Sequence, residues 1–225
     1  MIASREIIIP PLGLAGTLAV PGGAQALVVF AHGSGSSRLS PRNRMVAAAL
    51  NERGIATLLF DLLLPEEDGD RGKVFDIALL AARLADAVRW IDDEPALTAL
   101  PLGLFGASTG AAASIVAAAE LPGRVGAVVS RGGRPDLAGA ALRRLAAPTL
   151  LIVGGDDREV IALNEWALAR IRAPKDLAIV PGASHLFPEN GALEAVIDLA
   201  GAWFDRHLAA PLSRSPDVAV RSTAR

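Results

Sequence analysis

Residues 101–119 read PLGLF-GASTG-AAASIVAAA, and this stretch decides which fold the chain is expected to adopt. Its first five residues form a short apolar run of the kind found in buried strands, and the alanine-rich residues 111–119 are typical of a helix. Between them stands Gly106-Ala-Ser-Thr-Gly110, a G-x-S-x-G motif whose small residues allow the chain to reverse sharply. Such a turn lifts the hydroxyl of Ser108 above the sheet, next to a helix N-terminus that favours negative charge. The stretch therefore predicts an exposed serine nucleophile at the end of a strand.

Short apolar runs alternate with longer helical segments on both sides of this motif. The other runs rich in Val, Ile and Leu lie at residues 5–9, 14–20, 26–31, 55–60, 125–130, 148–153 and 176–180. Helices are expected at 41–54, 76–92, 160–172 and 192–208. The first two runs have no helix between them, so they predict an antiparallel pair at one edge. The whole pattern predicts an α/β fold, a mostly parallel sheet of about eight strands with helices on both faces.

The length of the chain bears on its domain organisation. Its 225 residues suit one globular domain, which we expect to span residues 1–209. No long insertion interrupts the alternation of strands and helices, so no large cap domain is expected. The polar residues 65–73 predict a loop, and residues 210–225 lack apolar periodicity and predict a flexible C-terminal tail.

Composition excludes several classes of function. The chain has no Cys, which rules out disulfides, thiolate metal sites and a Cys nucleophile, and its three His residues lack metal-ligand spacing. No metal and no cofactor is therefore expected. A net charge of −2 and an aromatic content of 4%, with no Tyr, disfavour nucleic-acid binding. No apolar run has the length of a membrane span and the N-terminus does not read as a signal peptide, so we expect no membrane partner and a cytoplasmic location.

A serine hydroxyl needs a base that accepts its proton. His185 lies in a loop directly after the run at 176–180, at the sheet edge that is expected to carry Ser108, and it is the candidate base. His207 lies near the C-terminal end of a predicted helix, where interaction with the helix dipole accounts for its presence without a catalytic role. His32 is expected to be structural and to bond neighbouring loops.

The base in turn needs an acid that orients it. Asp156 and Asp157 both follow the run at 148–153, and the chemistry of the residues alone does not choose between them. One of the two would accept a hydrogen bond from the imidazole, while the other caps the next helix or pairs with Arg158. Asp136 is a third candidate, although its position before a helical stretch is typical of an N-cap.

The serine, the aspartate and the histidine follow one another in the chain in the order Ser, Asp, His. In this order the chain resembles the α/β-hydrolase superfamily, and within it the small capless serine hydrolases of the dienelactone-hydrolase-like branch. The resemblance covers roughly residues 5–208. It rests on HGSG at 32–35, GASTG at 106–110, the G-x-x-D-x-x-V run at 154–160 and GASHLF at 182–187.

The resemblance implies roles for particular residues. It makes Asp157 the acid, with Asp156 as runner-up, because the family acid is the Asp of G-x-x-D-x-x-V. The motif geometry predicts the backbone amide of Thr109 as one oxyanion donor, and the resemblance implies the amide of Ser34 as the second. Dienelactone hydrolases use Cys as nucleophile, whereas this chain has Ser108, so the resemblance implies an esterase-like activity.

The sequence therefore predicts a serine hydrolase that cleaves a carboxylic ester, lactone or thioester of a small molecule, with Ser108, Asp157 and His185 as its catalytic triad. Arg131, Arg134, Arg38 and Phe187 are candidate substrate contacts, and a guanidinium there would bind a substrate carboxylate. An acyltransferase with the same triad and a non-catalytic binding protein remain alternatives. The sequence does not determine the oligomeric state.

Overall fold

A computed structural model describes residues 1–209 of the chain, and its centre is an eight-stranded sheet with the strand order β1-β2-β4-β3-β5-β6-β7-β8. The strands are β1 (Ile2–Ile9), β2 (Leu14–Pro21), β3 (Ala26–Ala31), β4 (Ile55–Phe60), β5 (Leu102–Ala107), β6 (Val125–Arg131), β7 (Thr149–Gly154) and β8 (Lys175–Val180). β1 and β2 pair antiparallel, β2 runs antiparallel to β4, and all other pairs are parallel. The predicted fold class and the antiparallel edge pair are confirmed.

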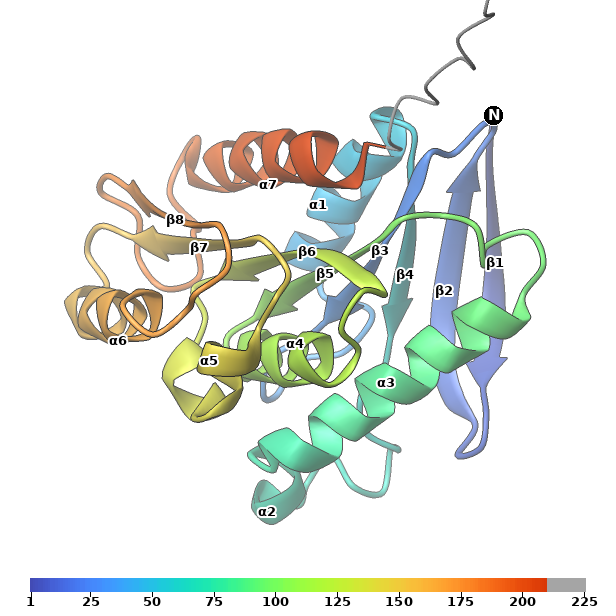
Figure 1. The fold of residues 1–225 in the computed structure, drawn as a ribbon, viewed down its shortest axis with the longest axis horizontal. Helices are drawn as coiled ribbons and strands as arrows, with labels where there is room; N and C mark the ends of the chain where they lie inside the picture. Colours follow the sequence, from blue (N-terminus) through green and yellow to red (C-terminus); the bar gives the residue numbers. More distant parts are fainter. Residues whose placement is uncertain (210–225) are drawn as a thin grey trace, which may run out of the picture.

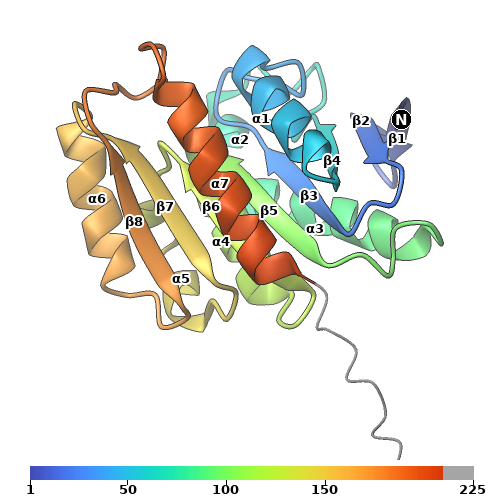
Figure 2. The ribbon, with the colours of Figure 1, turned by 90° about the horizontal axis from the view of Figure 1, so that it is seen from above.

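Helices cover both faces of this sheet. They are α1 (Pro41–Glu52), α2 (Arg71–Val74), α3 (Ile77–Asp93), α4 (Thr109–Glu120), α5 (Ala141–Arg144), α6 (Arg158–Leu168) and α7 (Ala192–Leu208), with a 3-10 helix η1 at Pro135–Ala138. α1 and α7 lie on one face, and α3, α4 and α6 lie on the other (Figures 1 and 2). Two apolar cores result, one on each side of the sheet. Strands β3, β4, β5 and β7 are buried along their whole length, which explains their nearly continuous apolar sequences.

The topology fixes where a site can form. β4 lies on one side of β3 and β5 lies on the other. The order in which the chain adds strands to the sheet therefore reverses at β3. Ligands of open α/β sheets bind outside the carboxyl ends of the strands at such a point. Ala31 at the end of β3 pairs with Gly106 near the end of β5. The loop that starts at His32 therefore lies beside the turn that holds Ser108.

Three segments depart from the sequence-based expectations. No bounds follow from the sequence for α2, η1 and α5, each of which is only four residues long. A helical stretch was expected after Asp136 with this residue as its N-cap, but η1 begins at Pro135 with Arg134 at its N-cap, so Asp136 lies inside the helix and the expected N-cap was wrong. The polar segment 65–73 is not simply a solvated loop, since Glu67 within it is buried. The predicted tail at 210–225 lies outside the described residues. Among residues 1–209, no helix combines the length and the apolar character that crossing a membrane requires.

Candidate active site

Ser108 occupies a strained turn between β5 and α4. Its backbone has φ 50° and ψ −121°, a conformation that residues with a side chain rarely adopt. The flanking glycines allow the turn, because a Cβ on Gly106 would lie 2.4 Å from the Cα of Ala111 and a Cβ on Gly110 would lie 2.2 Å from the carbonyl oxygen of Ala31. Ser108 itself is partly exposed. The G-x-S-x-G motif thus forms the strand–turn–helix that its residues predict.

Asp157 lies in the loop after β7 and His185 lies in the loop after β8. β7 pairs with β8 up to Gly154, so the loops that follow these strands start side by side. His185 Nδ1 lies 2.6 Å from Asp157 Oδ2, a short charge-assisted hydrogen bond in which the imidazole donates. Asp157 stands before α6 but makes no capping hydrogen bond with its side chain. Its carboxylate is therefore free to orient the histidine.

The other two candidate acids lie elsewhere. Asp156 is exposed, and its backbone amide donates to the carbonyl of Ala183, which ties the two loops together. The carboxylate of Asp136 accepts two hydrogen bonds from Arg134, at 2.9 and 2.8 Å. The structure thus brings Asp157 to the imidazole, a choice that the sequence chemistry alone left open.

One backbone segment connects Ser108 with His185. The amide of Ser108 donates to the carbonyl of Arg131 at 3.3 Å. The next residue, Gly132, packs closely on the backbone of His185, because a Cβ there would lie 2.9 Å from the His185 carbonyl oxygen, and it would be in van der Waals contact with the imidazole Cε1 at 3.7 Å. No hydrogen bond joins Ser108 Oγ to His185 Nε2 within residues 1–209, and such bonds are often long until a substrate binds. His185 is accessible to solvent, since 41% of its side chain is exposed.

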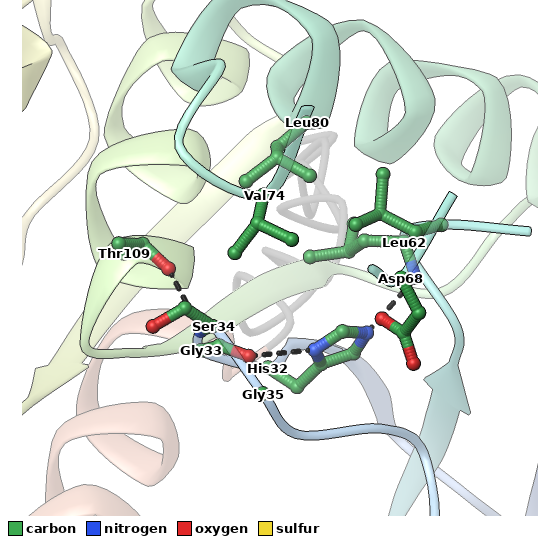
Figure 3. Close-up of a pocket in the computed structure, with 10 residues that line it drawn as sticks. His32, Gly33, Ser34, Gly35, Leu62, Asp68, Val74, Leu80 and Thr109 are labelled. Atoms are coloured by element: carbon green, nitrogen blue, oxygen red, sulfur yellow. Dashed lines mark hydrogen bonds between the residues drawn. The ribbon is translucent and has the colours of Figure 1, made fainter. Parts of the chain in front are cut away.

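The loop after β3 brings a second backbone amide to the serine turn. The amide of Ser34 donates to Thr109 Oγ1 at 3.1 Å, as Figure 3 shows. Close approach requires Gly33, because a Cβ there would lie 2.9 Å from the Cβ of Ser108. The amide of Thr109 is at the N-terminus of α4, where helix amides lack intrahelical partners. Two amides of the type needed for an oxyanion hole thus flank Ser108.

His32 holds this loop in place. Its Nδ1–H donates to the carbonyl of Gly33 and its Nε2 accepts from the amide of Leu62, both at 3.0 Å (Figure 3). The neutral imidazole satisfies both bonds, and burial lowers the pKa of His32. The cavity beside this histidine measures about 10 Å³, roughly the space of one water-sized sphere. His32 therefore positions the loop, as expected from the sequence.

A family model described as an alpha/beta hydrolase domain matches residues 24–195. The chain belongs to the α/β-hydrolase family. A dienelactone hydrolase from Anabaena variabilis is 53% identical, with a TM-score of 0.89 over 92% of this chain and 98% of that chain. Est1E from Butyrivibrio proteoclasticus is 15% identical with a TM-score of 0.76 over 91% of this chain and 99% of that chain, a likeness in fold alone.

Two longer relatives carry a different name. Proteins of two Mycobacterium tuberculosis strains, each named "Putative phosphoribosyl transferase", are 56% identical over 206 residues. The match covers 92% of this chain but 46% of each relative, so the chain spans about half their length.

In this α/β-hydrolase the four candidate substrate contacts have different surroundings. The guanidinium of Arg134 is held by Asp136, and that of Arg38 donates to Asp61 at 2.9 Å. Both groups are therefore already paired with carboxylates. Arg131 and Phe187 are buried, with 7% and 2% exposure, and Phe187 belongs to the apolar core on the side of α1 and α7.

Sequence reasoning missed an ion-pair cluster that supports the loop after β4. Glu67 accepts from Arg83 at 2.6 and 2.9 Å and from Lys73 at 2.8 Å, and it also accepts from the amide of Leu64. Arg83 also donates to the carbonyl of Leu62, the residue whose amide bonds His32. The signal for this cluster was a charged residue, Arg83, on the buried side of a predicted amphipathic helix.

The described part of the chain offers no obvious metal centre. Within residues 1–209, no group of three or more His, Asp or Glu side chains converges as metal ligands do. The chemistry of the site described above is that of a hydroxyl, an imidazole, a carboxylate and backbone amides.

Proposed function

We propose that the protein is a serine hydrolase that cleaves a carboxylic ester, lactone or thioester of a small substrate through an acyl-enzyme intermediate. The observation that carries this proposal is the 2.6 Å hydrogen bond between His185 Nδ1 and Asp157 Oδ2, at the same sheet edge as a serine with φ 50°. The 53% identity to a dienelactone hydrolase from Anabaena variabilis supports a hydrolytic reaction. Ser108 takes the role of nucleophile, where dienelactone hydrolases carry Cys.

The mechanism follows from the roles of these three side chains. Ser108 Oγ attacks the substrate carbonyl carbon while His185 Nε2 takes the hydroxyl proton. Asp157 keeps the imidazole in the Nδ1–H tautomer and stabilises the imidazolium that forms. The imidazolium then gives its proton to the leaving oxygen or sulfur, which departs and leaves an acyl group on Ser108. A water molecule repeats the sequence and releases the acid.

Backbone amides supply the electrostatic stabilisation in this scheme. The amides of Ser34 and Thr109 would bind the oxyanion of the tetrahedral intermediate. The Ser34 amide now donates to Thr109 Oγ1 at 3.1 Å, so the substrate oxygen would replace this hydroxyl as the acceptor. Loss of one such donor typically raises the barrier by about 2.7–4 kcal/mol.

The mycobacterial relatives are named for phosphoribosyl transfer, but this chain matches only 46% of their length. Transfer of a phosphoribosyl group is therefore not part of the proposal. Transfer of an acyl group to an alcohol uses the same triad and differs from hydrolysis only in the acceptor. An assay that offers both water and alcohols separates the two outcomes.

The test is hydrolysis of 4-nitrophenyl acetate by the purified protein, with and without added methanol, followed by a panel of lactones and thioesters. We expect release of nitrophenolate and acetate, and a loss of kcat of at least about 1,000-fold in Ser108→Ala. Circular dichroism checks that this variant keeps its fold. Equal rates for the wild type and Ser108→Ala, or no turnover on any substrate of the panel, would contradict the proposal. Methyl acetate as the main product would make the enzyme an acyltransferase.

A further inference from the structure

Phe187 has a strained backbone next to the proposed site. Within residues 1–209, Ser108 and Phe187 are the residues other than glycine that have a positive φ, at 50° and 55°. For a bulky side chain this is an outlying conformation, which persists only where the surrounding structure enforces it, and such residues gather at functional sites. The nucleophile turn explains the strain at Ser108. Phe187 is only 2% exposed, so its strain calls for an explanation other than contact with a ligand.

The backbone of Phe187 closes the turn that carries His185. The amide of Phe187 donates to the carbonyl of Ser184 at 3.1 Å, so His185 and Leu186 are the two central residues of this turn. The residues on either side of the turn differ from its tip in burial. Ala183 and Phe187 are 0% and 2% exposed, whereas Leu186 is 47% exposed. The turn thus raises the imidazole out of the core between two buried apolar residues.

The histidine turn and the serine turn meet at one piece of backbone. A Cβ on Gly132 would lie 2.9 Å from the carbonyl oxygen of His185 and 3.4 Å from Cε2 of the Phe187 ring. The residue before this glycine, Arg131, accepts the amide of Ser108 at its carbonyl. The ring of Phe187, which belongs to the apolar core on the side of α1 and α7, therefore holds the histidine turn against the segment that also fixes the serine turn.

We propose that Phe187 is a positioning residue for His185. Its buried ring, and the left-handed backbone that the ring holds in place, aim the imidazole at Asp157 and toward the hydroxyl of Ser108. The inference rests on the proposed hydrolase function for its effect on catalysis, whereas the bond between His185 and Asp157 is observable without turnover. Misplacement of a catalytic group by about 1 Å can lower a rate about 100-fold. Because Phe187 itself is buried, its replacement should change kcat rather than KM.

Three substitutions of Phe187 separate the ring from the backbone conformation. Phe187→Leu and Phe187→Ile both keep a buried apolar side chain, but the β-branch of isoleucine strongly disfavours a positive φ. Phe187→Gly accepts the positive φ and removes the ring. With 4-nitrophenyl acetate, Phe187→Leu should keep kcat within about fivefold of the wild type, and the Ile and Gly variants should lower it about 100-fold with KM changed less than about threefold. Equal kcat in the Leu and Ile variants, or a Gly variant within about threefold of the wild type, would overturn the proposal.

Two matched controls separate positioning from general loss of packing. Phe204 is fully buried in the same core but lies on α7, so Phe204→Leu should lower the melting temperature and leave kcat within about threefold of the wild type. Leu186→Ala changes the exposed tip of the turn and should also leave kcat within about threefold. Rates are measured well below the melting temperature of each variant. A loss of kcat in Phe204→Leu as large as that in Phe187→Ile would contradict the proposal. The Leu and Ile pair decides the matter even if Phe187→Gly does not fold.

Proton NMR reports the position of His185 without turnover. The Nδ1 proton in the 2.6 Å hydrogen bond to Asp157 should give a signal far downfield in the wild type and in Ser108→Ala. We expect this signal in Phe187→Leu and its loss, through exchange with water, in the Ile and Gly variants. Absence of the signal from the wild type, or its retention in all variants, would refute the positioning role.

The two measurements distinguish failure of this inference from failure of the proposed function. A protein that hydrolyses no ester, but loses the imidazole signal in Phe187→Ile and keeps it in Phe187→Leu, would refute the hydrolase and retain the role of Phe187 in holding His185. A protein that hydrolyses 4-nitrophenyl acetate equally well in every Phe187 variant would refute the positioning role and retain the hydrolase.

Discussion

Replacement of Asp157 by Asn isolates the contribution of the acid in the proposed triad. The substitution keeps the size and shape of the side chain but removes the charge from a hydrogen bond 2.6 Å long. An amide can turn its NH2 group toward His185, which would hold the imidazole in the tautomer that cannot accept the serine proton. Asp157 is mostly shielded from solvent, with 16% of its side chain exposed, so bulk water does not replace the lost charge.

The expected loss follows from this geometry. The same change in a serine protease triad lowers kcat by about 10⁴, which corresponds to about 5.4 kcal/mol of barrier at 1.36 kcal/mol per factor of ten. We expect a loss of this order for 4-nitrophenyl acetate, together with a melting temperature close to that of the wild type. The measurement is kcat by nitrophenolate release, with thermal unfolding as the check on folding.

The matched control is Asp156→Asn, which changes the exposed neighbouring carboxylate. Its kcat should stay within about threefold of the wild type, since surface substitutions usually change the free energy by no more than about 0.5 kcal/mol. The reasoning is refuted if Asp157→Asn retains more than about a tenth of the wild-type kcat, or if Asp156→Asn loses as much activity as Asp157→Asn.

Three further variants test the supports of the site. Gly33→Ala would place a Cβ 2.9 Å from that of Ser108, and we expect kcat to fall about 100-fold, as for loss of an oxyanion donor, in steady-state assays. Glu67→Gln should destabilise the protein by about 3 kcal/mol at pH 7 in urea unfolding, because it leaves the charge of Arg83 buried without a partner. Arg83 holds the pKa of Glu67 well below its usual 4.5. The difference in unfolding free energy between the wild type and Glu67→Gln should therefore be complete above about pH 5 and shrink as the pH falls below 4.5. Burial lowers the pKa of His32 below 6.5. The neutral imidazole should therefore stabilise the fold fully above pH 6.5, and this stabilisation should be lost on acidification. In His32→Ala the unfolding free energy should depend less on pH in that range.

The strand–turn–helix around Ser108 was predictable because its signal is local. Two glycines at fixed spacing, an apolar run before them and an alanine-rich run after them define one short piece of backbone. The structure adds the reason for the glycines, since Cβ atoms at Gly106 and Gly110 would lie 2.4 Å or less from neighbouring main-chain atoms. Strands and helices with continuous or periodic apolar residues were predictable on the same ground.

Features that depend on contacts between distant segments were not predictable. Asp156 and Asp157 are chemically alike. The pairing of β7 with β8 brings their loop to His185, and only the folded conformation of that loop turns the carboxylate of Asp157 to the imidazole. The burial of Glu67 depends on Arg83, sixteen residues further on, and its segment alone is indistinguishable from a solvated loop. Arg131 and Arg134 both looked like substrate contacts, and the sequence does not reveal that Asp136 pairs with only one of them.

Covalent labelling of the intact protein tests the central claim most directly. The protein is treated with a fluorophosphonate, its mass is measured, and the modified residue is located in the peptide that contains residues 106–110. Our account predicts one added phosphonyl group, attached to Ser108, that is absent from Ser108→Ala and forms much more slowly in Asp157→Asn than in Asp156→Asn. Wild-type protein that remains unlabelled, or that carries the label on another serine such as Ser34, would contradict it.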